Sequence, residues 1–134
     1  MTKTDLQNTL ILAGGDLAIF IAFALIGRET HAAGDPNLIV NTLPTLIPFV
    51  LMWLIVAAPF GVYRPGVYRA VPLAIIRTLA AWVLSGPVAI LIRAQLLQRT
   101  AIPLPFVAVT MGLNGGLLLG WHVFMAWWLR RTKR

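Results

Sequence analysis

The sequence LILAGGDLAIFIAFALIG, residues 10–27, decides the fold. It is almost entirely apolar, and it has about the 20-residue length that a helix needs to cross the hydrocarbon core of a bilayer. One carboxylate, Asp16, interrupts it. An ionisable side chain at the centre of such a helix costs at least about 2.5–3.5 kcal/mol, so it normally faces a partner or a wet cavity. We therefore expect a membrane helix that turns Asp16 into the protein.

The rest of the chain has the same character. It has 134 residues, of which 59% are hydrophobic and 11% are charged, and a soluble domain of this size cannot hide so much apolar surface. Three further apolar runs follow at residues 43–60, 71–97 and 103–129. The sequence thus predicts an all-α integral membrane bundle of four transmembrane helices, forming one domain over residues 1–134. Any site must lie within this bundle or at its rim.

The net charge of +7 indicates how the bundle is oriented. The basic residues gather at the ends of the apolar runs, which is typical of membrane topology and anionic lipid headgroups rather than of nucleic-acid binding. One side carries Lys3, Arg64, Arg69, Arg77, Arg130, Arg131, Lys133 and Arg134, whereas the other carries Arg28, Arg93 and Arg99. Because cytoplasmic loops are richer in Lys and Arg, both termini are predicted to be cytoplasmic.

Aromatic and basic residues mark the cytoplasmic rim. A short tandem echo, GVYR followed after one proline by GVYR, fills residues 61–69. Tyr, Trp and Arg suit the headgroup layer, so we expect lipid-interface anchors there and at the end of the last span. The alternative for the echo is a site for a lipid headgroup or a partner. The expected anchors are Tyr63, Arg64, Tyr68, Arg69, Trp127, Trp128, Arg130 and Arg131.

Three polar residues are predicted to lie at similar depth in the membrane. With a rise of about 1.5 Å per residue, Asp16, Arg77 and His122 all lie roughly 8–11 Å from the cytoplasmic ends of their helices. Arg93 lies nearer the opposite side, where it is expected to extend outward. The first three are predicted to form a buried polar cluster. It is either a structural clamp between helices, or a proton or ion site in which Asp16 titrates and Arg77 tunes it.

The sequence offers little for cofactor or enzyme chemistry. It has no cysteine, Walker loop, dinucleotide fingerprint, HExxH motif or nucleophile elbow, so no enzymatic activity, metal or cofactor is predicted. His122 beside Trp121 leaves a haem or chlorophyll-type pigment as a minor alternative. A bis-histidine haem site is excluded because the apolar runs contain no second histidine.

The last span carries the most specific packing signal. Ala108, Gly112, Gly116 and Gly120 recur at every fourth position and define a small-residue ridge, which permits close approach of helix backbones. We expect this ridge to pack within the bundle; the alternative is a homo-oligomer or a contact with a larger membrane complex. Asn114 on the same span is expected to form a hydrogen bond to another helix.

Several short segments resemble an uncharacterised prokaryotic family, domain of unknown function 3054. They are residues 15–17 and 24–28, His31, residues 48–53, Arg93 and residues 120–121. The resemblance implies a four-helix protein of a prokaryotic cell membrane with no assigned activity, and it brings no catalytic residues. It also implies arginine in relatives at the position of His122.

Two functions from different classes follow. The first is a structural or accessory bundle that associates with itself or with a larger membrane complex, as indicated by the ridge and the short loops. The second is a small transporter or channel subunit that uses a buried pair of Asp16 and Arg77. The chain shows no internal repeat of the kind common in transporters, which favours the first function.

Overall fold

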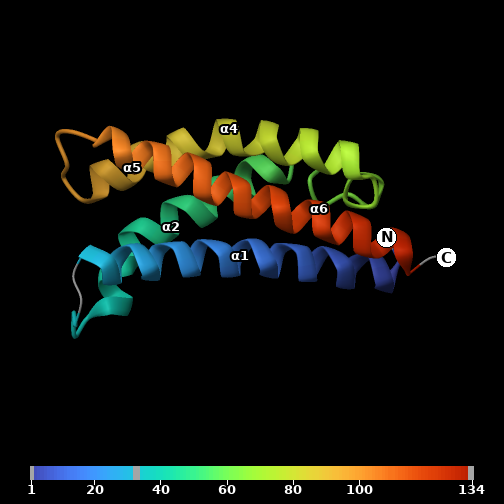
Figure 1. Cartoon of the computed structure of the whole chain (residues 1–134), viewed down its shortest axis with the longest axis horizontal. Helices are drawn as coiled ribbons and strands as arrows, with labels where there is room; N and C mark the ends of the chain where they lie inside the picture. The colour runs from blue at the N-terminus through green and yellow to red at the C-terminus, as the bar shows by residue number, and fades with distance from the viewer. Residues whose placement is uncertain (1, 32–33, 133–134) are drawn as a thin grey trace.

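The computed structural model describes residues 2–31 and 34–132, which fold into a bundle of long helices without a strand (Figure 1). The last long helix is divided by a π-helical turn, η1. In chain order the elements are α1 (Lys3–His31), α2 (Leu38–Ala57), α3 (Pro65–Tyr68), α4 (Val71–Leu96), α5 (Leu104–Val109), η1 (Thr110–Asn114) and α6 (Gly115–Arg131).

Four helices in the described residues are long and apolar enough to cross a membrane: Lys3–Thr30, Leu38–Ala57, Val71–Leu96 and Leu104–Arg131. The predicted all-helical chain with four such segments is confirmed. The first two helices begin earlier than the apolar runs indicated: the mostly polar residues 3–9 extend the first, and residues 38–42, of which 38–40 are apolar, extend the second.

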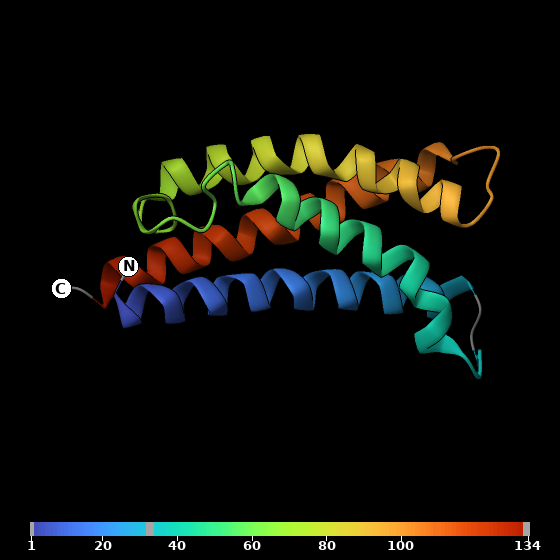
Figure 2. The same ribbon diagram turned by 180° about the vertical axis from the view of Figure 1, so that it is seen from behind.

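Successive long helices run in opposite directions, so α1 begins and α6 ends at the same end of the bundle (Figure 1). The short helix α3 and its flanking turns lie at this end too. The other end holds the end of α1, the start of α2 and the segment that joins α4 to α5 (Figure 1). From behind, α2 is seen to cross between α4 and α1 (Figure 2). This arrangement brings the middles of α1 and α6 close to the C-terminal part of α2, which carries Trp53.

An aromatic core joins α1, α2 and α4. Phe20, Phe49, Trp53 and Trp82 are almost fully buried, and the centroids of their contacting rings are 6.1–6.4 Å apart. Tilted and edge-on aromatic pairs at this spacing each contribute about 0.5–1.5 kcal/mol beyond simple burial. The core therefore fixes the position of α2, and with it the indole of Trp53 next to α1.

The π-helical turn lies where α4 packs on the last helix. The indole nitrogen of Trp82 donates to the Met111 carbonyl at 2.9 Å. Gly115 allows this approach, because a Cβ there would lie only 2.6 Å from that nitrogen. The Met111 carbonyl also accepts from the Gly115 backbone N–H, so the indole shares this acceptor with the helix.

Candidate functional site

Asp16 lies at the centre of the bundle with 1% of its surface exposed. Its Oδ2 accepts hydrogen bonds from the Trp53 indole at 2.9 Å and from the Tyr63 hydroxyl at 2.7 Å. Its Oδ1 lies 2.9 Å from His122 Nε2. These four residues, which we call the Asp16 centre, come from α1, α2, the turn after α2, and α6. One carboxylate thus links four separate parts of the chain.

The row of α1 residues that faces the bundle explains the position of Asp16. Leu12, Asp16, Phe20 and Ala24 are spaced four apart and are all buried, as one face of a helix requires. Tyr63 reaches the carboxylate because the chain turns back after α2. Gly61 has a positive φ of 71° in this turn, a conformation that glycine adopts without steric cost.

The bonding partners of Asp16 suit an ionised carboxylate, which only accepts hydrogen bonds. The indole can only donate, and the phenol is held protonated because burial, and then the Asp16 charge, raise the pKa of Tyr63 above its usual range. Trp53 also lies 2.9 Å from the Tyr63 oxygen, so its N–H is shared between the two acceptors. The imidazole completes the set when Nε2 carries the hydrogen.

Only one ring nitrogen of His122 has a hydrogen-bond partner among the described residues. Its ring is 1% exposed, and its second nitrogen, Nδ1, is buried without a hydrogen-bond partner in the described part of the chain. The ring also contacts the aromatic faces of Trp53 and Tyr63, with centroids 6.1 and 6.4 Å away. The pair of Asp16 and His122 is therefore enclosed by protein, and the described Lys and Arg side chains form no ion pair with it.

The structure does not bring Arg77 into this centre. Arg77 is exposed, whereas its neighbour Thr78 is fully buried. The inward face of α4 at this level is formed by Ala74, Thr78 and Ala81, so arginine is turned to the outside of the bundle. Depth alone did not specify the face of the helix. The residue that pairs with Asp16 among the described residues is His122, which carries a charge only when it is protonated.

The secondary polar candidates lie apart from the centre. Arg93 donates to the Thr45 hydroxyl at 2.9 Å and lies over the ring of Phe106, 4.3 Å from its centroid. It is half-buried against protein instead of extending freely outward. Asn114 is fully buried, but the expected hydrogen bond to another helix is not formed within the described residues, because both amide atoms are without partners.

The two tyrosines predicted as interfacial anchors are structural instead. Tyr63 bonds Asp16, and Tyr68 is 1% exposed with its hydroxyl 3.4 Å from the Asp5 carboxylate. Arg69 forms an ion pair with the same carboxylate at 2.6 Å. The echo therefore ties the turn after α2 to the start of α1. Arg64 is exposed.

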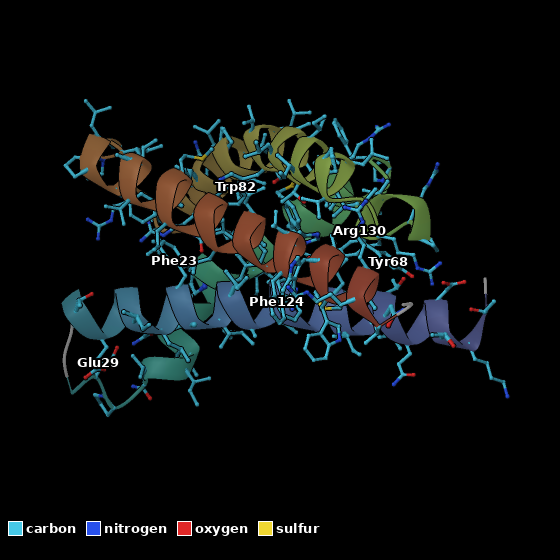
Figure 3. The ribbon with its side chains drawn as sticks, turned by 45° about the vertical axis from the view of Figure 1, so that its right-hand side comes forward. Phe23, Glu29, Tyr68, Trp82, Phe124 and Arg130 are labelled. Atoms are coloured by element: carbon cyan, nitrogen blue, oxygen red, sulfur yellow. The ribbon has the colours of Figure 1, made fainter. Side chains whose placement is uncertain are left out.

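The end of α6 keeps an exposed aromatic and basic surface. Trp127 and Trp128 are both exposed, and the guanidinium of Arg131 lies 3.8 Å from the centroid of the Trp127 ring. Arg130 and Tyr68 lie toward the same end of the bundle, with Glu29 at the opposite end (Figure 3). This end has the composition of a membrane interface.

The small-residue ridge points away from the bundle, so the expectation that it packs inside was wrong. Ala108, Gly112, Gly116 and Gly120 are all exposed. A Cβ added at any of the three glycines would meet no atom within 4 Å. Phe124, four residues further along, is exposed too. The glycine of this helix that packs tightly is Gly115, against Trp82.

The orientation of the ridge follows from the polar residues beside it. A second row with the same four-residue spacing is fully buried, and it is offset from the ridge by two positions, about 200° around the helix. Its members are Thr110, Asn114, Leu118, His122 and Ala126. Since three of these carry polar groups that are costly in lipid, this row faces the bundle and turns the ridge outward.

Comparison with known protein families finds a match to most of the sequence. Residues 13–125 match a family described as "Protein of unknown function (DUF3054)". The match includes the whole Asp16 centre and the small-residue ridge. Curated proteins and solved structures yield no match. Since the match covers most of the chain, the protein belongs to the DUF3054 family.

Proposed function

We propose that the protein is a multi-span protein of a prokaryotic cell membrane with both termini in the cytoplasm. The excess of Lys and Arg at the end where α1 begins and α6 ends supports this orientation. Reporter fusions at Asp35 and at Thr100 should be active outside the cell. A fusion after Arg64 that is active outside would contradict the proposed topology.

Within the membrane, we propose that the protein is a structural or accessory subunit that assembles through the small-residue ridge. The observation that carries this proposal is the position of Gly112, Gly116 and Gly120 on an open, outward face of the last helix. In lipid, helices associate where small residues let their backbones approach closely. An outward ridge in the bundle thus offers a contact for a helix of another molecule.

A second copy of the chain is the proposed occupant of the ridge. A row of small residues is complementary to itself, as a two-fold symmetric dimer requires. Phe124 and Trp128 continue the row beyond Gly120 at the same spacing, and both are exposed. They would give a dimer an aromatic contact toward the end with Arg130 and Arg131. These two arginines are also proposed to bind anionic lipid headgroups.

The test is a leucine placed on the ridge. Gly116→Leu should abolish the dimer and leave the bundle folded, because the new side chain meets open space. Gly14→Leu is a matched control, since Gly14 is also exposed and also open, but on α1. The measurement is the mass of the protein by native mass spectrometry from lipid nanodiscs. Equal masses for the wild type and both variants would refute assembly through the ridge. If another membrane protein co-purifies with the wild type and is lost from Gly116→Leu, that protein, and not a second copy of the chain, occupies the ridge.

The alternative function, a transporter or channel subunit with an Asp16–Arg77 site, is weakened because Arg77 is exposed. What favours that class of function is the buried pair of Asp16 and His122. Intramembrane ionisable residues commonly mark proton and ion pathways. Assembly through the ridge makes no use of this pair.

A further inference from the structure

Two of the three titratable groups of the Asp16 centre, Asp16 and His122, form a nearly solvent-free pair inside the bundle. We propose that the pair of Asp16 and His122 is a proton-binding site, which takes up one proton from water at the turn that carries Tyr63. The proposal stands on the geometry of the centre and is independent of assembly through the ridge.

The hydrogen bonds of the pair define its protonation states. Without the extra proton, His122 is neutral and donates from Nε2, and the ionised Asp16 leaves one net negative charge in the bundle. With the proton, the pair is neutral, either as imidazolium with carboxylate or as neutral imidazole with carboxylic acid. Both neutral forms keep the 2.9 Å contact between Nε2 and Oδ1. Release of the proton to water restores the single negative charge, so the site exchanges one proton.

Each protonation state leaves one polar atom without a hydrogen-bond partner, and that atom is always Nδ1 of His122. In either neutral form, Nδ1 of His122 carries a hydrogen that has no acceptor, whereas in the charged form it is a bare lone pair. The charged form therefore satisfies the donors better, and the neutral forms remove a net charge from an apolar interior. The two states thus carry opposing costs, and a site that binds and releases a proton requires these costs to be of similar size.

Apart from Tyr63, no described ionisable group bonds to the pair. From α2, the residue that reaches Asp16 is Trp53, which does not titrate; from the turn after α2 it is Tyr63, and from α6 it is His122. The inward face of α4 at this level carries Thr78, and the charged Arg77 of that helix is exposed. Uptake of a proton is thus governed by Asp16 and His122 themselves.

Tyr63 is the point of entry. Asp16, Trp53 and His122 are each about 1% exposed, whereas Tyr63 is only half-buried and lies in a turn between helices. Its hydroxyl donates to Asp16 at 2.7 Å and also accepts from Trp53. A phenol that both donates and accepts can pass a proton between water and a carboxylate by exchanging its own hydrogen. The other members of the centre have no comparable access.

The experiment follows the ring nitrogens of His122 by NMR in lipid nanodiscs. The chain has two histidines, so His31→Gln leaves His122 as the single ¹⁵N-histidine signal. A titration from about pH 4 to about pH 9 spans the usual range of imidazole. We expect one protonation step at the ring, and Asp16→Asn should lower the proton affinity of His122 at least about tenfold because the counter-charge is lost. If the ring signals of the His31→Gln protein stay constant over this range, the proposal is refuted. It is also refuted if the protein that carries Asp16→Asn in addition titrates at the same pH as the His31→Gln protein.

The entry point is tested by the rate at which the Nε2 proton exchanges with water. Tyr63→Phe should slow this exchange about tenfold, in line with the loss of one hydrogen-bonded link, while the protonation step itself remains. Tyr68→Phe is the matched control. Tyr68 occupies the same position in the second GVYR of the echo, but its hydroxyl bonds to the Asp5 carboxylate and not to Asp16. Equal exchange rates in the two variants would refute the role of Tyr63.

Discussion

Replacing Asp16 by leucine should remove the interaction that joins four parts of the bundle. The three contacts that would be lost, to Trp53, Tyr63 and His122, are 2.7–2.9 Å long. Polar contacts inside membrane proteins average about 0.6 kcal/mol and reach about 1.7 kcal/mol, so three of them amount to about 2–5 kcal/mol. We expect Asp16→Leu to lower the free energy of unfolding by that amount.

The partner of Asp16 can be identified by two double-mutant cycles. Asp16→Asn combined with His122→Gln should show a coupling of about 1 kcal/mol or more, because the two side chains are in contact. Asp16→Asn combined with Arg77→Leu should be additive within about 0.5 kcal/mol, because Arg77 lies on the outer face of α4. The second cycle is the control for the loss of a charge at Asp16.

The assay is reversible unfolding by SDS in mixed micelles, followed by tryptophan fluorescence. An Asp16→Leu variant within about 0.5 kcal/mol of the wild type would refute the structural role of the centre. A larger coupling to Arg77 than to His122 would show that the third long helix is rotated relative to this structure.

Two further predictions concern glycine packing and acid stability. Gly15→Ala should destabilise the protein by about 1–3 kcal/mol, because the new Cβ would collide with Trp121. Gly14→Ala is the control and should be neutral or slightly stabilising, since its Cβ meets open space and alanine favours the helix. Equal unfolding free energies of the two variants would contradict the close contact between Gly15 and Trp121. Hydrogen bonds from the Asn41 side chain, and then from Arg28, lower the pKa of Asp35 from 3.8 to about 2. Its stabilising contribution is therefore present above about pH 4 and is lost as the pH falls through about 2; unfolding measured across this interval should show the advantage of wild type over Asp35→Asn disappearing, and a constant difference would refute it.

The sequence allowed the number of helices and the inward position of Asp16 to be predicted. Both follow from local properties: the length of each apolar run, and the cost of a carboxylate in lipid. The pairing of Asp16 could not be predicted from depth, since depth places Arg77 and His122 at one level without saying which face of a helix each occupies. The contact of Trp53 was missed because an indole in an apolar run is equally compatible with a purely hydrophobic core.

Two errors had signals that could have corrected them. Tyr63 was interpreted as an interfacial anchor, although a phenol next to a glycine turn is well placed to fold back under the bundle. The ridge was expected to face inward, although Thr110, Asn114 and His122 form a row two residues away from it. A polar row and a small-residue row on opposite faces cannot both be buried in a bundle of this size. The polar row is buried because polar groups cost more than small residues when they face lipid.

The claim that the last helix turns its ridge outward to meet a second copy is tested most directly by cysteine cross-linking in cell membranes. The chain has no cysteine, so single cysteines can be introduced without removing others. Leu117 flanks the ridge and Leu84 lies on α4, and both are exposed. The account predicts that Leu117→Cys gives an oxidised dimer and that Leu84→Cys remains a monomer. A Leu117→Cys protein that stays monomeric under the same oxidation, or a Leu84→Cys protein that cross-links equally well, would contradict it.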